Sequence, residues 1–471
     1  YKPPFLAWLI AILARVFNGG HVNEFIARLP SALALTGMIM AGYRWASAVH
    51  GKRFAMVFSF ITMTAFEVFR AGMACRVDMV LTALMVVPIY IMYELREDPG
   101  RKVRHRRLRV LAAWLMLSGA TLTKGPVGAL LPCFAFGVYC LLRRDRFWPT
   151  FGRMISLALA SFVLPAIWYY AAYRQGGQPF LDLMYEEVFG RLFGTMSYES
   201  HVNPAWYNIV TLLSGLLPWT LFLLFLLFRV RRFHYVPPRT PGLFCTTVAI
   251  TIILFYCIPE SKRSVYLLPA YPFLCYGIAC ALEDPRSRPV LRLFAWVMAV
   301  VAVVAPVAAI ALRIVQDPRL PFGPIPWPGY IALALAMTSG VAWMANRHSP
   351  AGHTVVMVWA LWLAYVAAIM PAVLNPRSDH RALQRLADAP DGRVYEYFNG
   401  NFYRFYSLNY YLGDGIRPLE SRQALDSIPS GSYVLVPDVC DTTGMSRDFV
   451  FEPLLDRSAD HRNRVSLAIK K

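Results

Sequence analysis

The chain has 471 residues, of which 57% are hydrophobic and only 16% are charged, whereas an average soluble domain carries about a quarter charged residues. Repeated apolar runs long enough to cross about 30 Å of hydrocarbon predict a multi-pass membrane protein rather than a large soluble core. The net charge of +19 gathers in short clusters between these runs. This pattern is typical of cytoplasmic loops and argues against nucleic-acid binding.

Twelve apolar runs predict twelve membrane spans along the chain. They lie at about residues 29–46, 54–69, 79–95, 109–123, 126–142, 154–173, 205–228, 241–258, 265–282, 292–313, 328–345 and 353–372. When the crossings are counted, every basic cluster falls on one side, which is then the cytoplasm. The cytoplasmic segments are residues 50–53, 96–108, 143–153, 229–240, 283–291 and 346–352. The external segments are residues 1–28, 70–78, 174–204, 259–264 and 314–327 and everything after about 373.

Residues 376–471 differ in character from the rest, because the apolar runs shorten and turn signals such as "APDG", "LGDG" and "IPSG" appear. The segments "RVYEYF", "YSLNYYL" and "SYVLVPD" read as short strands or as strands alternating with helices. We therefore predict a transmembrane domain over residues 1–375 and a small soluble α/β domain over residues 376–471, on the external side.

The first residues include no initiator methionine and no signal-type charged segment, and the count of crossings places them outside. A first residue on the external side requires a preceding span. The sequence thus predicts a helix and its following loop upstream of residue 1, which makes about thirteen helices in the full-length protein.

Three lysines fall in external segments, where basic residues are normally depleted: Lys2 in "YKPP", Lys124 in "TKGP" and Lys262 in "ESKR". Charges that break the orientation statistics are expected to serve chemistry. Proline and glycine after Lys2 and Lys124 interrupt the helix, so that backbone amides and an ammonium can converge on an anion such as a phosphate. The alternative for each lysine taken alone is a side chain that extends from a helix end to the membrane surface.

Asp78 in "CRVDMVLTALM" begins an apolar run at the external boundary. Its carboxylate either caps the start of the helix or points into a cavity between helices. We expect the neighbouring Arg70 and Arg76 to keep it ionised.

The longest external loop between spans, read with its borders from Tyr173 to Asn208, carries Glu187, Arg191, His201 and Trp206. Glu187 and Arg191 are four residues apart, which is the spacing of an ion pair on a helix. His201 and Trp206, in "HVNPAWY", offer a wall for a sugar ring or else form part of an interfacial aromatic belt. No Walker motif and no HExxH occurs, and the cysteines show no metal-ligand spacing.

The chain resembles the lipid-dependent glycosyltransferases of the GT-C fold, most closely the branch that joins bacterial aminoarabinose transferases to protein O-mannosyltransferases. The matching segments occur in the family's order over residues 1 to about 280: "KPPFLAW", "RLPSAL", "RVDMVLTAL", "TKGPVGALLP", "PAWYN…GLLPW" and "KRSVYLLPAYP". The resemblance implies an integral membrane enzyme that takes a sugar from a polyprenyl phosphate. The enzyme would transfer this sugar to an acceptor on the periplasmic or lumenal side.

The resemblance also implies roles for single residues. Lys2 matches a lysine that contacts the phosphate of the donor, and its expected partners there are Arg191, Lys262, Arg263 and Tyr266. Asp78 matches a supporting acidic position near the sugar. For the pocket of the sugar and the acceptor we select Glu187, His201, Trp206 and Lys124. Cations placed in this way would stabilise the negative charge that develops on the leaving phosphate.

The sequence departs from the family's pattern in two respects. The principal acidic residue of the family precedes "KPP", so we expect it upstream of residue 1. Aminoarabinose transferases also carry residues implicated in metal binding at two places that hold Tyr1 and Val188 here. The sequence therefore supports no metal site, and we name no cofactor.

Taken together, these observations predict an all-α polytopic membrane protein of GT-C type with a small C-terminal α/β domain. We place it in a bacterial inner membrane, with the active site and the C-terminal domain in the periplasm. Its expected partners are a polyprenyl-phosphate sugar donor, a lipid A-type glycolipid or protein acceptor, and membrane lipids.

A lipid-carrier flippase or transporter is the main alternative, in which the intramembrane charges would line a translocation path. Against it, the unusual charges cluster at one face and the sequence shows no internal repeat. A non-catalytic relative that binds partners through its external domain is a third possibility.

Overall fold

The structure is a computed structural model with two compact units, residues 1–299 with 346–359 and residues 300–345 with 360–471, and each unit is treated by itself. It describes residues 3–97, 106–186, 202–204, 206–229, 239–259, 261–315, 322–346, 350–375, 380–387, 389, 393–397, 406–413, 415–437, 440, 442, 445–455 and 465–471.

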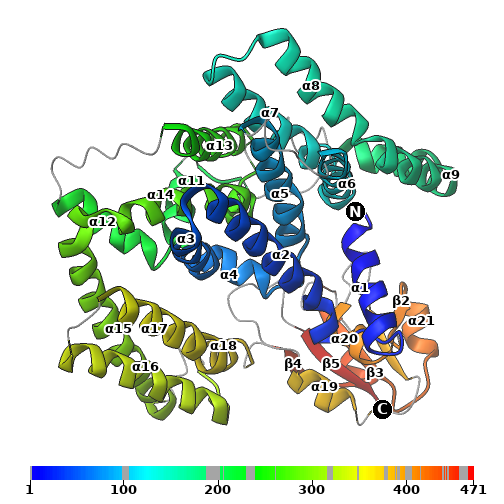
Figure 1. The fold of residues 1–471 in the computed structure, drawn as a ribbon. Coiled ribbons are helices and arrows are strands. Elements are labelled where there is room, and N and C mark those ends of the chain that lie inside the picture. The colour runs from blue at the N-terminus through cyan, green and yellow to red at the C-terminus, as the bar shows by residue number, and fades with distance from the viewer. Residues whose placement is uncertain are drawn as a thin grey trace. The chain divides into compact units, whose positions relative to one another are not determined.

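The first unit is helical (Figure 1). Its elements are α1 (Phe5–Phe17), α2 (Glu24–His50), α3 (Lys52–Thr64), α4 (Phe66–Gly72), α5 (Val77–Glu97), α6 (Arg106–Lys124), α7 (Val127–Leu142), α8 (Phe147–Ala160), α9 (Val163–Tyr185), α11 (Tyr207–Gly215), α12 (Trp219–Arg229), α13 (Arg239–Cys257), the 3₁₀ helix η2 (Ser264–Ala270), α14 (Tyr271–Glu283), the 3₁₀ helix η3 (Pro285–Ser287), and parts of α15 (Arg288–Val315) and α17 (Pro350–Ala364).

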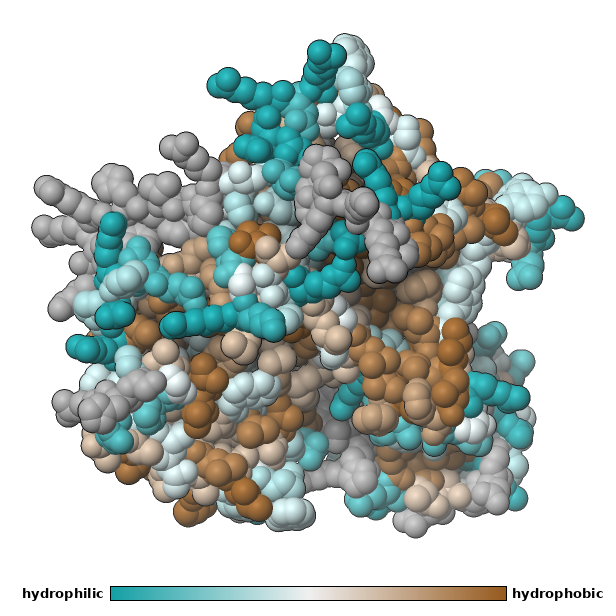
Figure 2. Space-filling view, viewed as in Figure 1, coloured by the Kyte–Doolittle hydropathy of each residue, from teal (hydrophilic) through white to brown (hydrophobic). Residues whose placement is uncertain are grey.

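Each of the twelve predicted spans coincides with a helix or with consecutive helices. In the part of the chain that the structure describes, eight helices are long and apolar enough to cross a membrane. Two more pairs pass the same test with a bend, of 72° between α3 and α4 and of 107° between α11 and α12. Figure 2 shows hydrophobic residues at the surface of many helices, as lipid surroundings require. The prediction of a polytopic helical membrane protein is confirmed.

The core of the first unit is an aromatic cluster around Trp45 of α2. The indole stacks on Tyr90 of α5 with ring centroids 5.0 Å apart, and it contacts Phe58 of α3, Phe244 of α13 and Tyr276 of α14 at 6.1, 5.7 and 5.6 Å. Such ring pairs contribute about 0.5–1.5 kcal/mol each beyond the burial of their area. The cluster thus packs five helices against one another. The candidate site lies at the ends of several of these helices.

The two bent pairs meet at their breaks. The amide of Phe66 donates to the carbonyl of Leu217 at 2.9 Å, and the indole Nε1 of Trp219 donates to Oγ1 of Thr64 at 3.0 Å. Backbone groups that a broken helix leaves without intrahelical partners are thus satisfied by the other broken helix, which is the condition for irregular backbone inside a membrane protein.

Gly128 of α7 packs directly against the backbone of α6. A Cβ added at this position would overlap the backbone carbonyl of Ala120, so the two helices pack here through a residue without a side chain. We expect Gly128→Ala to lower the free energy of unfolding by about 1–3 kcal/mol, because the helices must separate. Thermal melting in detergent would measure this. Gly152→Ala in α8 is the control, since its Cβ meets nothing within 4 Å; equal melting temperatures for both variants would contradict the prediction.

The second unit holds the remaining helices and a five-stranded sheet. Its elements are the rest of α15 and α17, α16 (Trp327–Ala345), the π-helix η4 (Tyr365–Ile369), α18 (Met370–Leu374), α19 (His380–Leu386), β1 (Val394–Tyr397), α20 (Tyr406–Tyr411), β2 (Arg417–Leu419), α21 (Arg422–Ser427), β3 (Tyr433–Pro437), the 3₁₀ helix η6 (Met445–Arg447), β4 (Phe449–Leu455) and β5 (Val465–Lys470).

The sheet has the order β2-β1-β3-β5-β4, in which β1 is parallel to β2 and β3 while β5 is antiparallel to β3 and β4. Helices cover both of its faces. Val434 packs in one buried cluster with Leu425 of α21, and Leu435 packs in another with Leu386 of α19 and Leu408 of α20, because successive strand residues point to opposite faces. The predicted small C-terminal α/β region is confirmed. The domain boundary at residue 375 and the external location stay predictions.

Contacts between loops agree with the counted crossings. The guanidinium of Arg96 donates to both carboxylate oxygens of Asp145, at 2.9 and 2.6 Å, and Arg53 lies 3.8 Å from Glu283. Each pair joins two segments that the sequence assigns to the cytoplasmic side. The hydrogen bonds from Arg96 also lower the pKa of the Asp145 carboxyl below its ordinary value. Each contact thus brings two loops together at the same ends of their helices.

Candidate functional site

The ends of α5 and α6 bring a carboxylate and an ammonium together. Nζ of Lys124 donates to Oδ1 of Asp78 at 2.7 Å, and the two side chains are only 16% and 9% exposed. Asp78 lies in the first turn of α5, where the helix dipole favours a negative charge. Lys124 is the last residue of α6, and Gly125 follows it with a φ of +82°, which ends the helix and turns the chain toward α7.

A tyrosine from the third segment of the site covers this ion pair. Nζ of Lys124 lies 4.2 Å from the centroid of the Tyr266 ring, so the ammonium contacts the ring face. Tyr266 belongs to η2, and its ring lies 5.6 Å from that of Tyr256 at the end of α13. Asp78, Lys124 and Tyr266, which the sequence selected separately, therefore form one cluster.

The segment that leads into η2 is held in place from the other side by residues of the long external loop. Ser261 pairs with Val202 in an antiparallel bridge, and Nδ2 of Asn203 donates to the carbonyl oxygen of Lys262 at 3.0 Å. These contacts fix the backbone of Lys262 and of Arg263, which is extended and half-buried immediately before η2.

Lys262 is the least compensated charge in this region. The residue is only 6% exposed, yet its ammonium has neither a hydrogen-bond acceptor nor a carboxylate partner among the residues that the structure describes. A buried charge without a partner is costly, so such groups are usually paired or kept for function. An anion that enters the site would supply the missing partner.

Arg70 pairs with Glu67 rather than with Asp78, the carboxylate that the sequence predicts for it. We expected it to keep Asp78 ionised, but the structure bonds Asp78 to Lys124, while Arg70 donates to both carboxylate oxygens of Glu67, at 3.0 and 2.6 Å. The reason is local, since Glu67 lies three residues earlier on α4 and is within direct reach. Arg70 also lies 3.5 Å from the hydroxyl of Ser264 in η2, so this ion pair borders the segment that holds Tyr266.

Sequence reasoning missed Glu67, Tyr256 and Asn203. Glu67 is only 3% exposed and had a readable signal, because an acidic residue within a predicted span is expected to be functional or paired. Tyr256 and Asn203 gave no such signal, since an aromatic residue near a helix end and an asparagine before a proline are both common on membrane proteins and in turns.

The remaining predicted residues are not brought into the cluster by the described coordinates. Lys2, Glu187, Arg191 and His201 lie outside the described residues, and so does the predicted ion pair between Glu187 and Arg191. Trp206 is described; it immediately precedes α11 and is 61% exposed. Its part in a sugar pocket stays a prediction.

Comparison with known proteins finds relatives that match part of this chain in sequence. The sequence profile of the dolichyl-phosphate-mannose-protein mannosyltransferase family matches residues 1–170. An uncharacterised protein of Aquifex aeolicus is 28% identical over 58% of this chain and 58% of its own length. An undecaprenyl phosphate-alpha-4-amino-4-deoxy-L-arabinose arabinosyl transferase of Proteus mirabilis is 25% identical over 72% of this chain and 60% of its own length. The chain thus spans less than two thirds of these relatives.

A solved structure extends the similarity to nearly the whole fold. The crystal structure of ArnT from Cupriavidus metallidurans bound to undecaprenyl phosphate superposes with a TM-score of 0.73 at 21% identity, over 99% of this chain and 87% of that one. The chain therefore has the GT-C fold, as the resemblance in the sequence implied. It is a multi-pass membrane protein of this architecture.

Proposed function

We propose that this protein is a membrane glycosyltransferase that moves a sugar from a polyprenyl phosphate to an acceptor hydroxyl at the periplasmic face of a bacterial inner membrane. The observation that carries the proposal is Lys262, a residue only 6% exposed whose ammonium has no counter-ion among the described residues. It stands four residues before Tyr266, in the segment that also covers the Lys124–Asp78 ion pair. A phosphate ester is the anion that such cations bind well.

In the proposed reaction the bond between the anomeric carbon of the sugar and the phosphate oxygen breaks, and its electron pair stays on the phosphate. The acceptor oxygen forms the new bond to the anomeric carbon, and its proton passes to a carboxylate. Lys262 would stabilise the charge that develops on the leaving phosphate. Asp78 forms an ion pair with Lys124, so we assign it a supporting role.

The relatives support the choice of donor. The Proteus mirabilis protein is named for undecaprenyl phosphate carrying an aminoarabinose, and the ArnT crystal structure holds undecaprenyl phosphate. We propose a donor of this class for the present chain, with Lys2, Arg191 and Arg263 as further phosphate ligands. The acceptor would be a lipid A-type glycolipid or a protein, bound near Glu187, His201 and Trp206.

The test uses the full-length protein, purified in detergent, with undecaprenyl phosphate carrying radiolabelled aminoarabinose or mannose. We expect the wild-type protein to release or transfer the sugar, and Lys124→Ala to lower the rate about 100-fold, because a preorganised charge at the site is lost. Lys52→Ala is the control, since Lys52 is exposed at the start of α3. If the wild-type protein binds the lipid without cleaving it, and vesicles show that the lipid crosses the bilayer, the flippase alternative replaces the proposal.

A further inference from the structure

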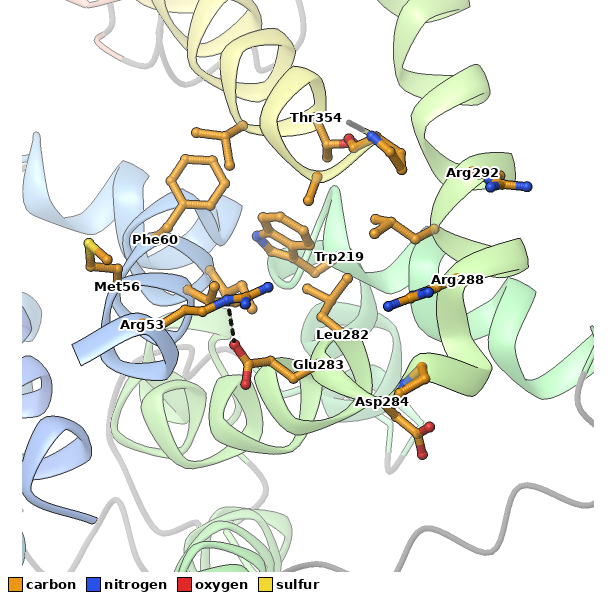
Figure 3. Close-up of a pocket in the computed structure, with 17 residues that line it drawn as sticks. Arg53, Met56, Phe60, Trp219, Leu282, Glu283, Asp284, Arg288, Arg292 and Thr354 are labelled. Atoms are coloured by element: carbon orange, nitrogen blue, oxygen red, sulfur yellow. Dashed lines mark hydrogen bonds and ion pairs between the residues drawn. The ribbon is translucent and has the colours of Figure 1, made fainter. Parts of the chain in front are cut away.

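A cavity of about 740 Å³ lies in the first unit, lined by residues other than those of the candidate site. It is lined by the first turns of α3, by the end of α14 and by the starts of α15 and α17, with Trp219 on its wall (Figure 3). The same helices reach the candidate site from their other ends, since α14 follows η2 directly and α3 leads to α4. The cavity therefore opens at the other end of these helices, on the side that the sequence assigns to the cytoplasm.

Basic residues outnumber acidic residues in the lining of this cavity. It has three arginines, Arg53, Arg288 and Arg292, and two acidic residues, Glu283 and Asp284. Glu283 is paired with Arg53 at 3.8 Å. Asp284 caps η3, where its carboxylate accepts a hydrogen bond from the amide of Arg286 at 2.8 Å.

The other two arginines of the lining are not part of this pairing. Arg288 and Arg292 are one turn apart on α15, and among the described residues neither has an ion-pair partner. In Figure 3, Arg53 and Arg288 extend into the cavity from opposite walls. The lining thus carries a net positive charge, with Arg53 and Arg288 turned inward and Arg292 farther out on α15, its guanidinium turned away from Arg288 (Figure 3).

The wall behind these arginines is apolar. Phe60, Leu282, Leu291 and Val355 line it, and Met56 at its border is 58% exposed. A site of this kind joins a cationic rim at the membrane surface to an apolar wall at the depth of the acyl chains. Basic pockets between membrane helices on the cytoplasmic side are suited to anionic lipid headgroups, and arginine binds phosphate through two parallel hydrogen bonds.

We propose that this cavity binds an anionic phospholipid of the inner leaflet, with its phosphate at Arg288, the charge of Arg292 one turn farther along α15, and the upper part of its acyl chains against Phe60 and Leu282. The volume is in the range of pockets that enclose a small ligand. This lipid site is separate from the proposed donor site and does not depend on the glycosyltransferase activity.

Native mass spectrometry of the detergent-purified, full-length protein would test the proposal with phosphatidylglycerol as the probe. We expect retained phosphatidylglycerol on the wild-type protein. In the variant Arg288→Gln/Arg292→Gln its Kd should rise about 30-fold, since each arginine near an anionic lipid contributes about fivefold. Ala351→Trp, which fills the cavity without changing a charge, should also lower the retention. Arg153→Gln on the exposed surface of α8 is the matched control and should bind as the wild type does.

Two further probes identify the source of the phosphate. Phosphatidylcholine has the same chains but no net charge, and glycerol 3-phosphate has the charge but no chains; both should bind more weakly than phosphatidylglycerol. Equal retention of phosphatidylglycerol by the wild type, the double arginine variant and Ala351→Trp would overturn the proposal. Binding of glycerol 3-phosphate as tightly as the lipid would assign the cavity to a soluble phosphate ester and overturn the lipid assignment.

Discussion

Lys262→Met is expected to abolish sugar transfer while leaving the thermal stability of the protein unchanged or higher. The residue is only 6% exposed and its ammonium has no counter-ion among the described residues, so an apolar side chain of similar length fits its surroundings and breaks no ion pair. The same charge is proposed to stabilise the leaving phosphate, and loss of one preorganised group of this kind costs about 10²–10³ in rate. The measurement is the transfer rate together with the melting temperature in detergent.

The opposite signs of the two effects make this variant informative. A structural lysine would lower both the stability and the activity when it is replaced. Lys52→Met serves as the control, because it removes an exposed lysine from the start of α3 and should change neither quantity. Unchanged transfer by Lys262→Met would refute the role at the phosphate. A large fall in the melting temperature would instead show that the ammonium has a structural partner.

Asp78→Asn should have the largest effect on stability of the variants considered at the site. It leaves the ammonium of Lys124, which is only 16% exposed, without its carboxylate partner. Breaking a buried ion pair from one side typically costs about 3–5 kcal/mol. We expect a value near the lower end, about 3 kcal/mol, because the face of Tyr266 continues to contact the ammonium.

A double-mutant cycle separates stability from function at this pair. Lys124→Met alone leaves Asp78 buried without a partner and should also destabilise the protein, whereas Asp78→Asn/Lys124→Met removes both charges and should recover most of the lost stability. Transfer activity should not recover in the double variant, since the proposed reaction uses these charges. Additive losses of stability would show that the two side chains do not interact in solution, and recovered transfer would show that the pair is only structural.

The bends of α3–α4 and α11–α12 illustrate what the apolar pattern could not reveal. Hydrophobicity over residues 54–69 and 205–228 predicts a span in each case, and helices occupy both ranges. The bends of 72° and 107° arise where the two broken helices satisfy each other's backbone and side-chain groups. A partner so distant in sequence leaves no periodic signal in either run.

In the C-terminal region, too, the sequence predicts only part of the secondary structure. "RVYEYF" and "SYVLVPD" were readable as strands because β1 and β3 are buried on both faces and rich in apolar and aromatic residues. "YSLNYYL" is the helix α20 over most of its length. The strands β4 and β5 were not singled out, since their pairing, with β5 between β3 and β4, is decided by contacts across the sheet.

The sequence by itself determined that this is a polytopic membrane protein, where its helices lie, and which lysines and aspartate break the normal placement of charge. It could do so because hydrophobic length and loop charge act locally. Only the tertiary structure decided that Asp78 pairs with Lys124 under Tyr266, that Arg70 pairs with Glu67, and that Lys262 is buried without a described partner. The physical reason is that ion pairing and desolvation depend on which helix ends meet in space, and Asp78 and Lys124 meet only after α5 and α6 have packed.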